Sequence, residues 1–325
     1  MIFLAPALVL STARSASIVE GERTSPLNDD RMRFNSFRAM AEKGEVAAQV
    51  ELGLCYMEGR GVSKNPEEAA RWFRKAAEKG SSSAKQSLGV AYSKGVGVPK
   101  DQVEAVKWFR KAAEEGDAYA QNDLGLCYAE GEGVAVNMTE AAKWFTASAK
   151  QGNAAGQYDL GNCYVTGFGV VKDDAQAIKW FRKAAEQGYG AAFSRLGAML
   201  EVRGEFAEAA EWYLKGANQG IASAQFGLAG CYCRGKGVEK DYVEAYRWLV
   251  RSDAGGVTES LKILNFIMKQ MTPEQIREGQ RRSGLPLQPP QPSLADKEGH
   301  IGATNLNHTT PTKTNQTIST GTTSR

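Results

Sequence analysis

The sequence contains little histidine. Of its 325 residues only His300 and His308 are histidine, and both lie in a tail rich in Thr, Asn and Pro that has little apolar material to fold around. A histidine metal site and a histidine-dependent catalytic triad are therefore excluded from the folded part. We expect no catalytic residue, no metal ion and no cofactor.

The sequence also lacks an excess of charge and a long apolar run. Its 40 Lys and Arg residues are interleaved with 37 Asp and Glu residues, which argues against nucleic acid as a partner. No stretch reaches the ~18 apolar residues of a membrane-spanning helix, so we expect no integral membrane segment. The apolar start at Met1 to Leu10 resembles a secretory leader, but no Lys or Arg precedes Ile2 as such leaders require.

What the sequence does contain is repetition. Six tryptophans each begin an aromatic or apolar pair, and successive pairs are separated by 36, 36, 36, 32 and 36 residues. The pairs are Trp72-Phe73, Trp108-Phe109, Trp144-Phe145, Trp180-Phe181, Trp212-Tyr213 and Trp248-Leu249. Most copies also carry a Leu-Gly pair and a tyrosine, and every copy ends at a glycine.

Each copy is predicted to form two amphipathic helices, A and then B. Ala48, Leu52 and Tyr56 recur every four positions, and apolar residues from Ala69 to Ala76 recur at helical spacing. Gly53 in helix A should allow helix B to approach closely, because a Cβ there would push the backbones apart.

Helix B is predicted to begin after a column of capping residues. Five of the six residues in this column are strong N-caps, and Pro66 suits the first helical position. The column consists of Asn65, Asp101, Asn137, Asp173, Glu205 and Asp241. A left-handed glycine is expected just after helix B.

These marks together resemble the Sel-one-like repeat (SLR), a member of the tetratricopeptide-repeat superfamily. The resemblance implies an all-α fold, an α-solenoid of two-helix repeats wound into a right-handed superhelix. It covers residues 45–256 as six copies, 45–80, 81–116, 117–152, 153–188, 189–220 and 221–256. The fifth copy departs from the pattern because it lacks four loop residues and the Gly-x-Gly-Val sequence.

The ends are predicted to close the array. We expect residues 1–30 to form an apolar leader or signal peptide followed by disorder, and residues 31–44 to form a capping helix. Residues 257–283 should form C-terminal capping helices, the last opened by a capping box at Thr272-Pro273-Glu274-Gln275. Residues 284–325 are predicted to be a disordered tail.

Three motifs invite a chemical interpretation. The loop Gly59-Arg60-Gly61-Val62 resembles a phosphate loop, but it joins two helices and recurs in other copies, so we interpret it as a structural turn. Ser82-Ser83-Ala84-Lys85 matches the S-x-x-K of penicillin-recognising enzymes, without their other motifs beside it. A hydrolase acting on penicillin-like substrates is therefore kept only as an alternative.

The cysteines form a column and are expected to be free. Cys55, Cys127, Cys163 and Cys231 occupy one position whose other members are apolar, which is typical of a packed face. Secreted relatives pair such a cysteine with one on helix B, where this sequence has alanine. That difference favours a reducing compartment, whereas the leader favours export, so secreted or periplasmic and cytoplasmic locations both stay open.

The expected function is that of a protein–protein interaction scaffold or adaptor, not an enzyme. Resemblance to tetratricopeptide arrays implies that a protein or peptide partner binds the concave face, at positions two before, two after and five or six after the leucine of Leu-Gly. The polar residues chosen there are Lys94, Asn122, Glu130, Tyr158, Asn162 and Arg234. We expect a monomer; a purely structural assembly module that self-associates through its ends is a further alternative.

Overall fold

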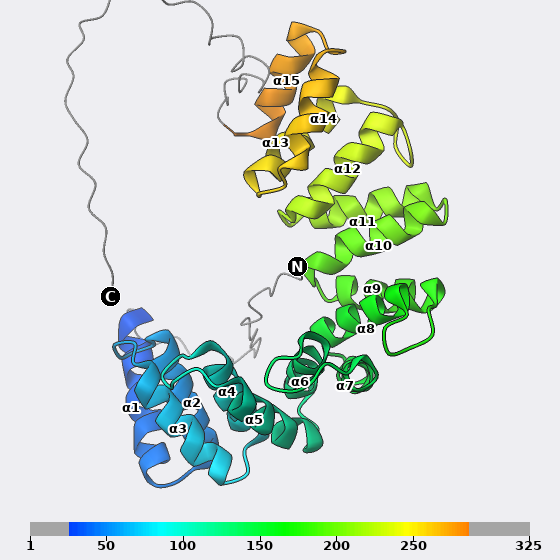
Figure 1. Cartoon of the computed structure of the whole chain (residues 1–325). Coiled ribbons are helices and arrows are strands. Elements are labelled where there is room, and N and C mark those ends of the chain that lie inside the picture. The colour runs from blue at the N-terminus through cyan, green and yellow to red at the C-terminus, as the bar shows by residue number, and fades with distance from the viewer. Residues whose placement is uncertain (1–25, 286–325) are drawn as a thin grey trace, which may run out of the picture. The chain divides into compact units, whose positions relative to one another are not determined.

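The computed structural model describes residues 26–285, and the expected leader and nearly all of the expected tail lie outside this range. The described residues form helices and no strand. Figure 1 shows the helix pairs following one another along the chain. The prediction of an all-α solenoid of two-helix repeats is confirmed.

Each of the six repeats contributes one helix A and one helix B. The A helices are α2 (Val46–Glu58), α4 (Ser82–Lys94), α6 (Ala118–Glu130), α8 (Ala154–Thr166), α10 (Gly190–Val202) and α12 (Ala222–Arg234). The B helices are α3 (Pro66–Glu78), α5 (Gln102–Glu114), α7 (Met138–Lys150), α9 (Asp174–Glu186), α11 (Phe206–Asn218) and α13 (Tyr242–Ala254). The ends are formed by α1 (Pro26–Glu42), α14 (Glu259–Met268) and α15 (Pro273–Ser283).

The predicted caps of helix B are formed in five of the six repeats. Each Asn or Asp side chain of the column accepts a hydrogen bond from a backbone amide in the first turn, as Asp101 does from Glu104. Glu205 makes no side-chain cap. The glycines that close the repeats, such as Gly80, have positive φ angles, as predicted. In the fifth repeat Arg203, Gly204 and Glu205 alone join α10 to α11.

The Leu-Gly glycine allows helix A to approach helix B, as predicted. A Cβ built on Gly53 would lie 2.5 Å from the Phe73 ring, the second member of the aromatic pair. The same contact recurs on Phe109, Phe145, Phe181 and Tyr213 in the next four repeats. Since these rings are buried, the glycine and the aromatic ring form the packing unit of each repeat.

Other recurring residues join one repeat to the next. A Cβ on Gly97, the second glycine of a Gly-x-Gly-Val loop, would collide with the Pro66 carbonyl at the start of the preceding helix B. The buried Gln121 Nε2 donates to the Ala113 carbonyl oxygen near the end of the preceding helix B, at 3.1 Å. The glycine loops therefore pack against the neighbouring repeat, which supports their interpretation as structural turns.

The A helices form the more closely spaced layer of the stack. Successive A helices approach one another at α4 and α6, at α6 and α8, and at α10 and α12. No two successive B helices from α3 to α13 are as close. We call the surface of the A layer that faces away from the B helices the helix A face.

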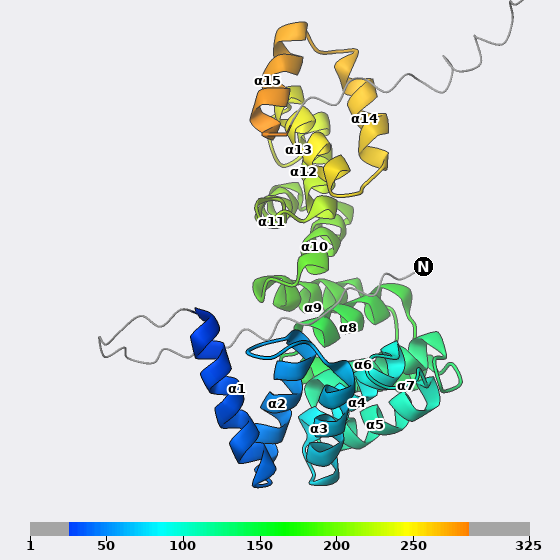
Figure 2. The same ribbon diagram turned by 90° about the vertical axis from the view of Figure 1, so that its left-hand side faces the viewer.

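The C-terminal helices close the array by packing on the last helix B. Figure 2 shows α14 and α15 flanking α13, and both pack against it. The predicted capping box is formed: the Thr272 amide donates to Gln275 Oε1, and the Gln275 amide donates to the Thr272 hydroxyl. At the other end, α1 begins at Pro26, five residues before the expected boundary at residue 31.

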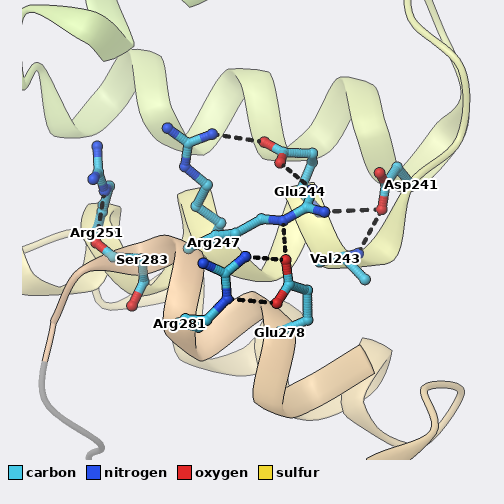
Figure 3. Close-up of polar contacts among 9 residues, drawn as sticks. Asp241, Val243, Glu244, Arg247, Arg251, Glu278, Arg281 and Ser283 are labelled. Atoms are coloured by element: carbon cyan, nitrogen blue, oxygen red, sulfur yellow. Dashed lines mark hydrogen bonds and ion pairs between the residues drawn. The ribbon is translucent and has the colours of Figure 1, made fainter. Parts of the chain in front are cut away.

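Polar contacts hold α15 on α13 (Figure 3). Arg251 Nε donates to the Ser283 carbonyl oxygen at 2.9 Å, and Arg282 pairs with Glu244 at 2.8 Å. Glu278 accepts from both Arg281 and Arg282 on its own helix. The last helix also carries the exposed charged side chains of Glu274 and Arg277, so its outer face is polar, as the end of a helical array requires.

Candidate functional site

A row of polar side chains crosses three successive A helices. Gln86 on α4 donates from Nε2 to Asp123 Oδ2 on α6 at 2.7 Å. The Asn122 amide, also on α6, donates to the Asp159 carboxylate on α8. Asn122 is buried, whereas Asp123 and Asp159 are partly exposed. The row therefore lies partly open on the helix A face.

The two carboxyls of this row have shifted acidity. Burial raises the pKa of Asp159 to about 7; the hydrogen bond from Asn122 opposes this shift, and the charges of Glu130 and Asp123 add to it. Burial likewise raises the pKa of Asp123 to about 6, against the hydrogen bond from Gln86. Both groups titrate near neutral pH, unlike ordinary aspartates.

Asp123 and Asp159 were not among the predicted site residues. The positions implied by tetratricopeptide arrays do not include the residue directly before the leucine of Leu-Gly. Asp123 and Asp159 directly precede this leucine, where Glu51 stands in the first repeat. Carboxylates at one helix register in several repeats were the available signal. Each aspartate at this register reaches back to the preceding helix A, where Gln86 donates to Asp123 and Asn122 donates to Asp159.

Tyr158 belongs to an aromatic cluster at the same place. Its ring centroid lies 5.6 Å from that of Phe181 and 5.2 Å from that of Tyr189. Burial and the nearby Asp159 raise the pKa of Tyr189 to about 12, so its hydroxyl stays protonated at neutral pH. Asn162, half-buried, lies four residues after Tyr158 on α8.

Lys94 and Glu130 lie at the exposed ends of α4 and α6. The positive charge of Lys94 slightly favours the ionised form of Asp123. Burial, together with the charge of Glu132, raises the pKa of Glu130. Five of the six predicted site residues thus come from three neighbouring A helices.

Arg234 is the sixth and stands apart on α12. Its guanidinium pairs with Glu201 on α10 at 2.6 Å. It lines a cleft of about 250 Å³ together with Cys233 and the exposed Phe266. Burial raises the pKa of the Cys233 thiol, which is the opposite of what a reactive thiolate needs.

The other motifs are occupied by structural contacts. The Lys85 ammonium of the S-x-x-K match is buried and paired with Glu115 on the next helix B. Cys55, Cys127, Cys163 and Cys231 are buried free thiols, as their column predicts. Burial raises the pKa of the last three to about 12.

Within residues 26–285, no cluster of metal-ligating side chains occurs. Across the same range, every helix is too short or too polar to cross a bilayer.

Comparison with known proteins identifies the repeats. The Sel1 repeat profile matches residues 46–81, 82–117, 118–153, 154–189, 196–221 and 222–252, which is more than half of the chain. The shortened fifth match lies in the copy that lacks four loop residues. No curated protein matches the chain.

Solved structures give the same result. A protective antigen of uropathogenic Escherichia coli with an SLR fold is 38% identical with a TM-score of 0.68, over 77% of this chain and 56% of the antigen, so the chain spans little more than half of that relative. A Sel1 repeat protein from Oxalobacter formigenes is 32% identical with a TM-score of 0.59, over 70% of this chain and 97% of the relative.

The fold alone extends to more distant helical-repeat proteins. The Cut9–Hcn1 assembly of the APC/C aligns with a TM-score of 0.52 at 15% identity, over 74% of this chain and 46% of the other. From the six matched repeats and the relatives at 38% and 32% identity, this chain belongs to the Sel1 repeat family.

Proposed function

We propose that this chain is a non-catalytic scaffold that binds a peptide or extended protein segment on the helix A face, centred on α4, α6 and α8. Sel1 repeat and related helical-repeat proteins typically act as protein–protein interaction scaffolds. The observation that carries the proposal is the row of amide and carboxyl groups from Gln86 to Asp159, in which Gln86, Asp123 and Asp159 are partly exposed. Such groups can hydrogen-bond the backbone and side chains of an extended partner.

The spacing of the helices also supports this face. In a curved stack the more closely spaced layer lies on the inside of the curve, so the A helices occupy the side where a groove forms. The residues that pack the two helices of a repeat, such as Leu124, Gly125 and Phe145, are buried and unavailable to a partner. The exposed and half-buried helix A positions can vary without loss of the fold.

A photo-crosslinking comparison tests the assignment. A benzophenone amino acid is placed at Asn162 on α8 or at the exposed Lys179 on α9, in otherwise identical full-length chains. We expect the probe at Asn162 to crosslink one specific protein segment in the native cell, and the probe at Lys179 not to do so. Specific crosslinks from Lys179 alone would place binding on the B helices and contradict the proposal.

Substitutions at the two asparagines should have separable effects. Asn162→Ala removes a half-buried amide, so partner affinity should fall while the melting temperature stays nearly unchanged. Asn122→Ala removes a buried amide that donates to Asp159, so it should lower both affinity and melting temperature. Unchanged affinity for the crosslinked partner in both variants would remove these residues from the site.

A further inference from the structure

The inference that follows rests on the proposed function and concerns what the bound segment presents to α6 and α8. Asp123 and Asp159 occupy the same register on these adjacent helices, and α6 and α8 pack directly against one another. Each carboxyl accepts a hydrogen bond from a neutral amide, Gln86 or Asn122. Neither takes part in an ion pair among the described residues.

The surroundings of Asp159 contain no balancing cation of their own. The groups that act on it are the carboxyls of Glu130 and Asp123 and the hydroxyl of Tyr189, while the Cys163 thiol lies on its own helix. From α9, the Phe181 ring packs against Tyr158 on α8. From α7, the uncharged Ser148 and Ala149 approach α8 at Gly156.

Asp123 has only slightly more positive surroundings. Lys94 at the exposed end of α4 is the cation that acts on it, and its effect is smaller than those of burial, Gln86 and the Asp117 carboxyl. The Cys127 thiol lies one turn further along α6. Negative charge is therefore least compensated at Asp159, the carboxyl further from Lys94 along the row.

A second observation indicates a missing donor at the same place. Asn122 is only 6% exposed, and its Oδ1 is buried without a hydrogen-bond partner. A buried acceptor without a donor is unfavourable, and such atoms are uncommon in folded proteins. The other end of this amide already donates to Asp159, so the unused acceptor lies beside the uncompensated carboxyl.

We propose that Asp159, Asn122 and Asp123 form a subsite for a basic side chain, a lysine or arginine of the bound partner segment. An ammonium or guanidinium group carries several donors and no acceptor, which matches two carboxylates and an amide oxygen. The rings of Tyr158 and Tyr189, 5.2 Å apart, offer an aromatic surface to a cation at the same place. A neutral or acidic side chain would leave the carboxyls unpaired.

The subsite should depend on pH. Because burial holds the pKa of Asp159 at about 7 and that of Asp123 at about 6, both carboxyls are largely protonated in mildly acidic solution. A cation binds the ionised form, so binding releases protons and becomes tighter as pH rises through this range. Glu130 contributes in the same sense, since its pKa is also raised.

The test uses N-acetyl-arginine N-methylamide and its neutral citrulline analogue, titrated into the full chain and followed by amide NMR. We expect the arginine probe at about pH 8 to shift resonances of α6 and α8 in a saturable way, and to bind at least about tenfold more weakly at about pH 5.5. The citrulline probe should bind at neither pH. Equal binding of the two probes, or no saturable shifts on α6 and α8, would overturn the proposal.

Matched variants identify the residues. Asp159→Asn keeps an acceptor for the Asn122 amide but removes the charge, and should weaken arginine binding by at least about tenfold at about pH 8. Asp123→Asn should have a smaller effect in the same direction. Glu51→Gln, the same change of charge at the same register in the first repeat, should leave binding unchanged. If Glu51→Gln lost as much affinity for the arginine probe as Asp159→Asn, the effect would come from net charge alone, and the subsite would be contradicted.

The outcome is separable from that of the proposed function. If the Asn162 crosslink persists at full strength in Asp159→Asn and the arginine probe does not bind, the scaffold function stands and the basic-side-chain subsite is wrong. If the crosslink never forms on the helix A face but the arginine probe binds, the proposed partner face is wrong.

Discussion

Two regions of the helix A face use similar acidic side chains in opposite ways. Between α10 and α12, the Glu201 carboxylate is neutralised by Arg234 at 2.6 Å. Between α6 and α8, Asp159 receives only the Asn122 amide and lies near two further carboxyls. The scaffold is the same in both regions, since a glycine on helix A meets an aromatic ring of helix B in the third, fourth and fifth repeats.

This difference is the basis for proposing a partner site between α6 and α8 and not between α10 and α12. The carboxylate of Glu201 is already compensated within the chain, so it gains little from an external cation. Burial raises the pKa of Asp123 and Asp159 more than the hydrogen bonds from Gln86 and Asn122 lower it, and no ion pair compensates either carboxylate among the described residues. The chain thus holds a compensated carboxylate between α10 and α12 and, between α6 and α8, two carboxyls that we propose are compensated by a bound cation.

The largest expected effect is on the free energy of unfolding, and it tests whether the helix pairs of the two regions are packed in the same way. Gly125→Val places a side chain against the Phe145 ring, and Gly197→Val does the same against Tyr213. Each should lower the free energy of unfolding by about 1–3 kcal/mol through overpacking. Urea denaturation of both variants measures this; a large difference between them would show that the two repeats are packed differently.

The next effect concerns the charge of Asp159 and sharpens the comparison. The folded pKa of this acid lies above its unfolded value, so the folded chain binds the extra proton and loses stability as pH rises from about 4 to about 7. Asp159→Asn should therefore raise the free energy of unfolding by about 1 kcal/mol at about pH 8 and hardly at all at about pH 4.

Thermal melts of wild type and Asp159→Asn at the two pH values provide the measurement. A variant that gains stability while losing arginine binding would show that the ionised carboxyl is kept at a cost to the fold. Equal destabilisation at both pH values would instead indicate a purely structural role for Asp159.

The smallest expected effect breaks the compensated pair. Glu201→Gln removes a partly exposed ion pair, so stability should change by about 0.5 kcal/mol or less. Binding of the arginine probe at α6 and α8 should be unaffected, because Glu201 and Arg234 lie on later A helices, α10 and α12. Urea denaturation measures the change in stability, and the NMR titration measures affinity for the arginine probe. A marked drop in probe affinity would show that the two regions are not independent.

The packing of this chain could be predicted from its sequence because the same packing residues recur in successive copies. Gly53 with its equivalents and the capping column from Asn65 to Asp241 each recur at one register, so a single physical reason explains every copy. The exception is Glu205, which forms no side-chain cap in the shortened fifth repeat. The start of α1 at Pro26 was also missed, because no recurring residue marks it.

The candidate site was only partly predictable because the sequence does not show which side chains meet between neighbouring A helices. Asn122 was found by its register, but its burial and its donation to Asp159 require knowing which side chains meet across α6 and α8. Arg234 was chosen by another register of the same face, six residues after the leucine, yet Glu201 pairs with it. Periodicity indicates which face a residue occupies, and not whether its partner lies within the chain.

The most direct test of the account is the titration of the Asp159 carboxyl, followed by carbon-13 NMR of the side chain in the full-length protein. The account predicts a pKa of about 7 in the free chain, falling toward that of an ordinary aspartate when the arginine probe saturates α6 and α8. A pKa near 4 both without and with the probe would mean that the carboxyl is already solvated. It would contradict the claim that the free chain leaves this carboxylate without a compensating cation.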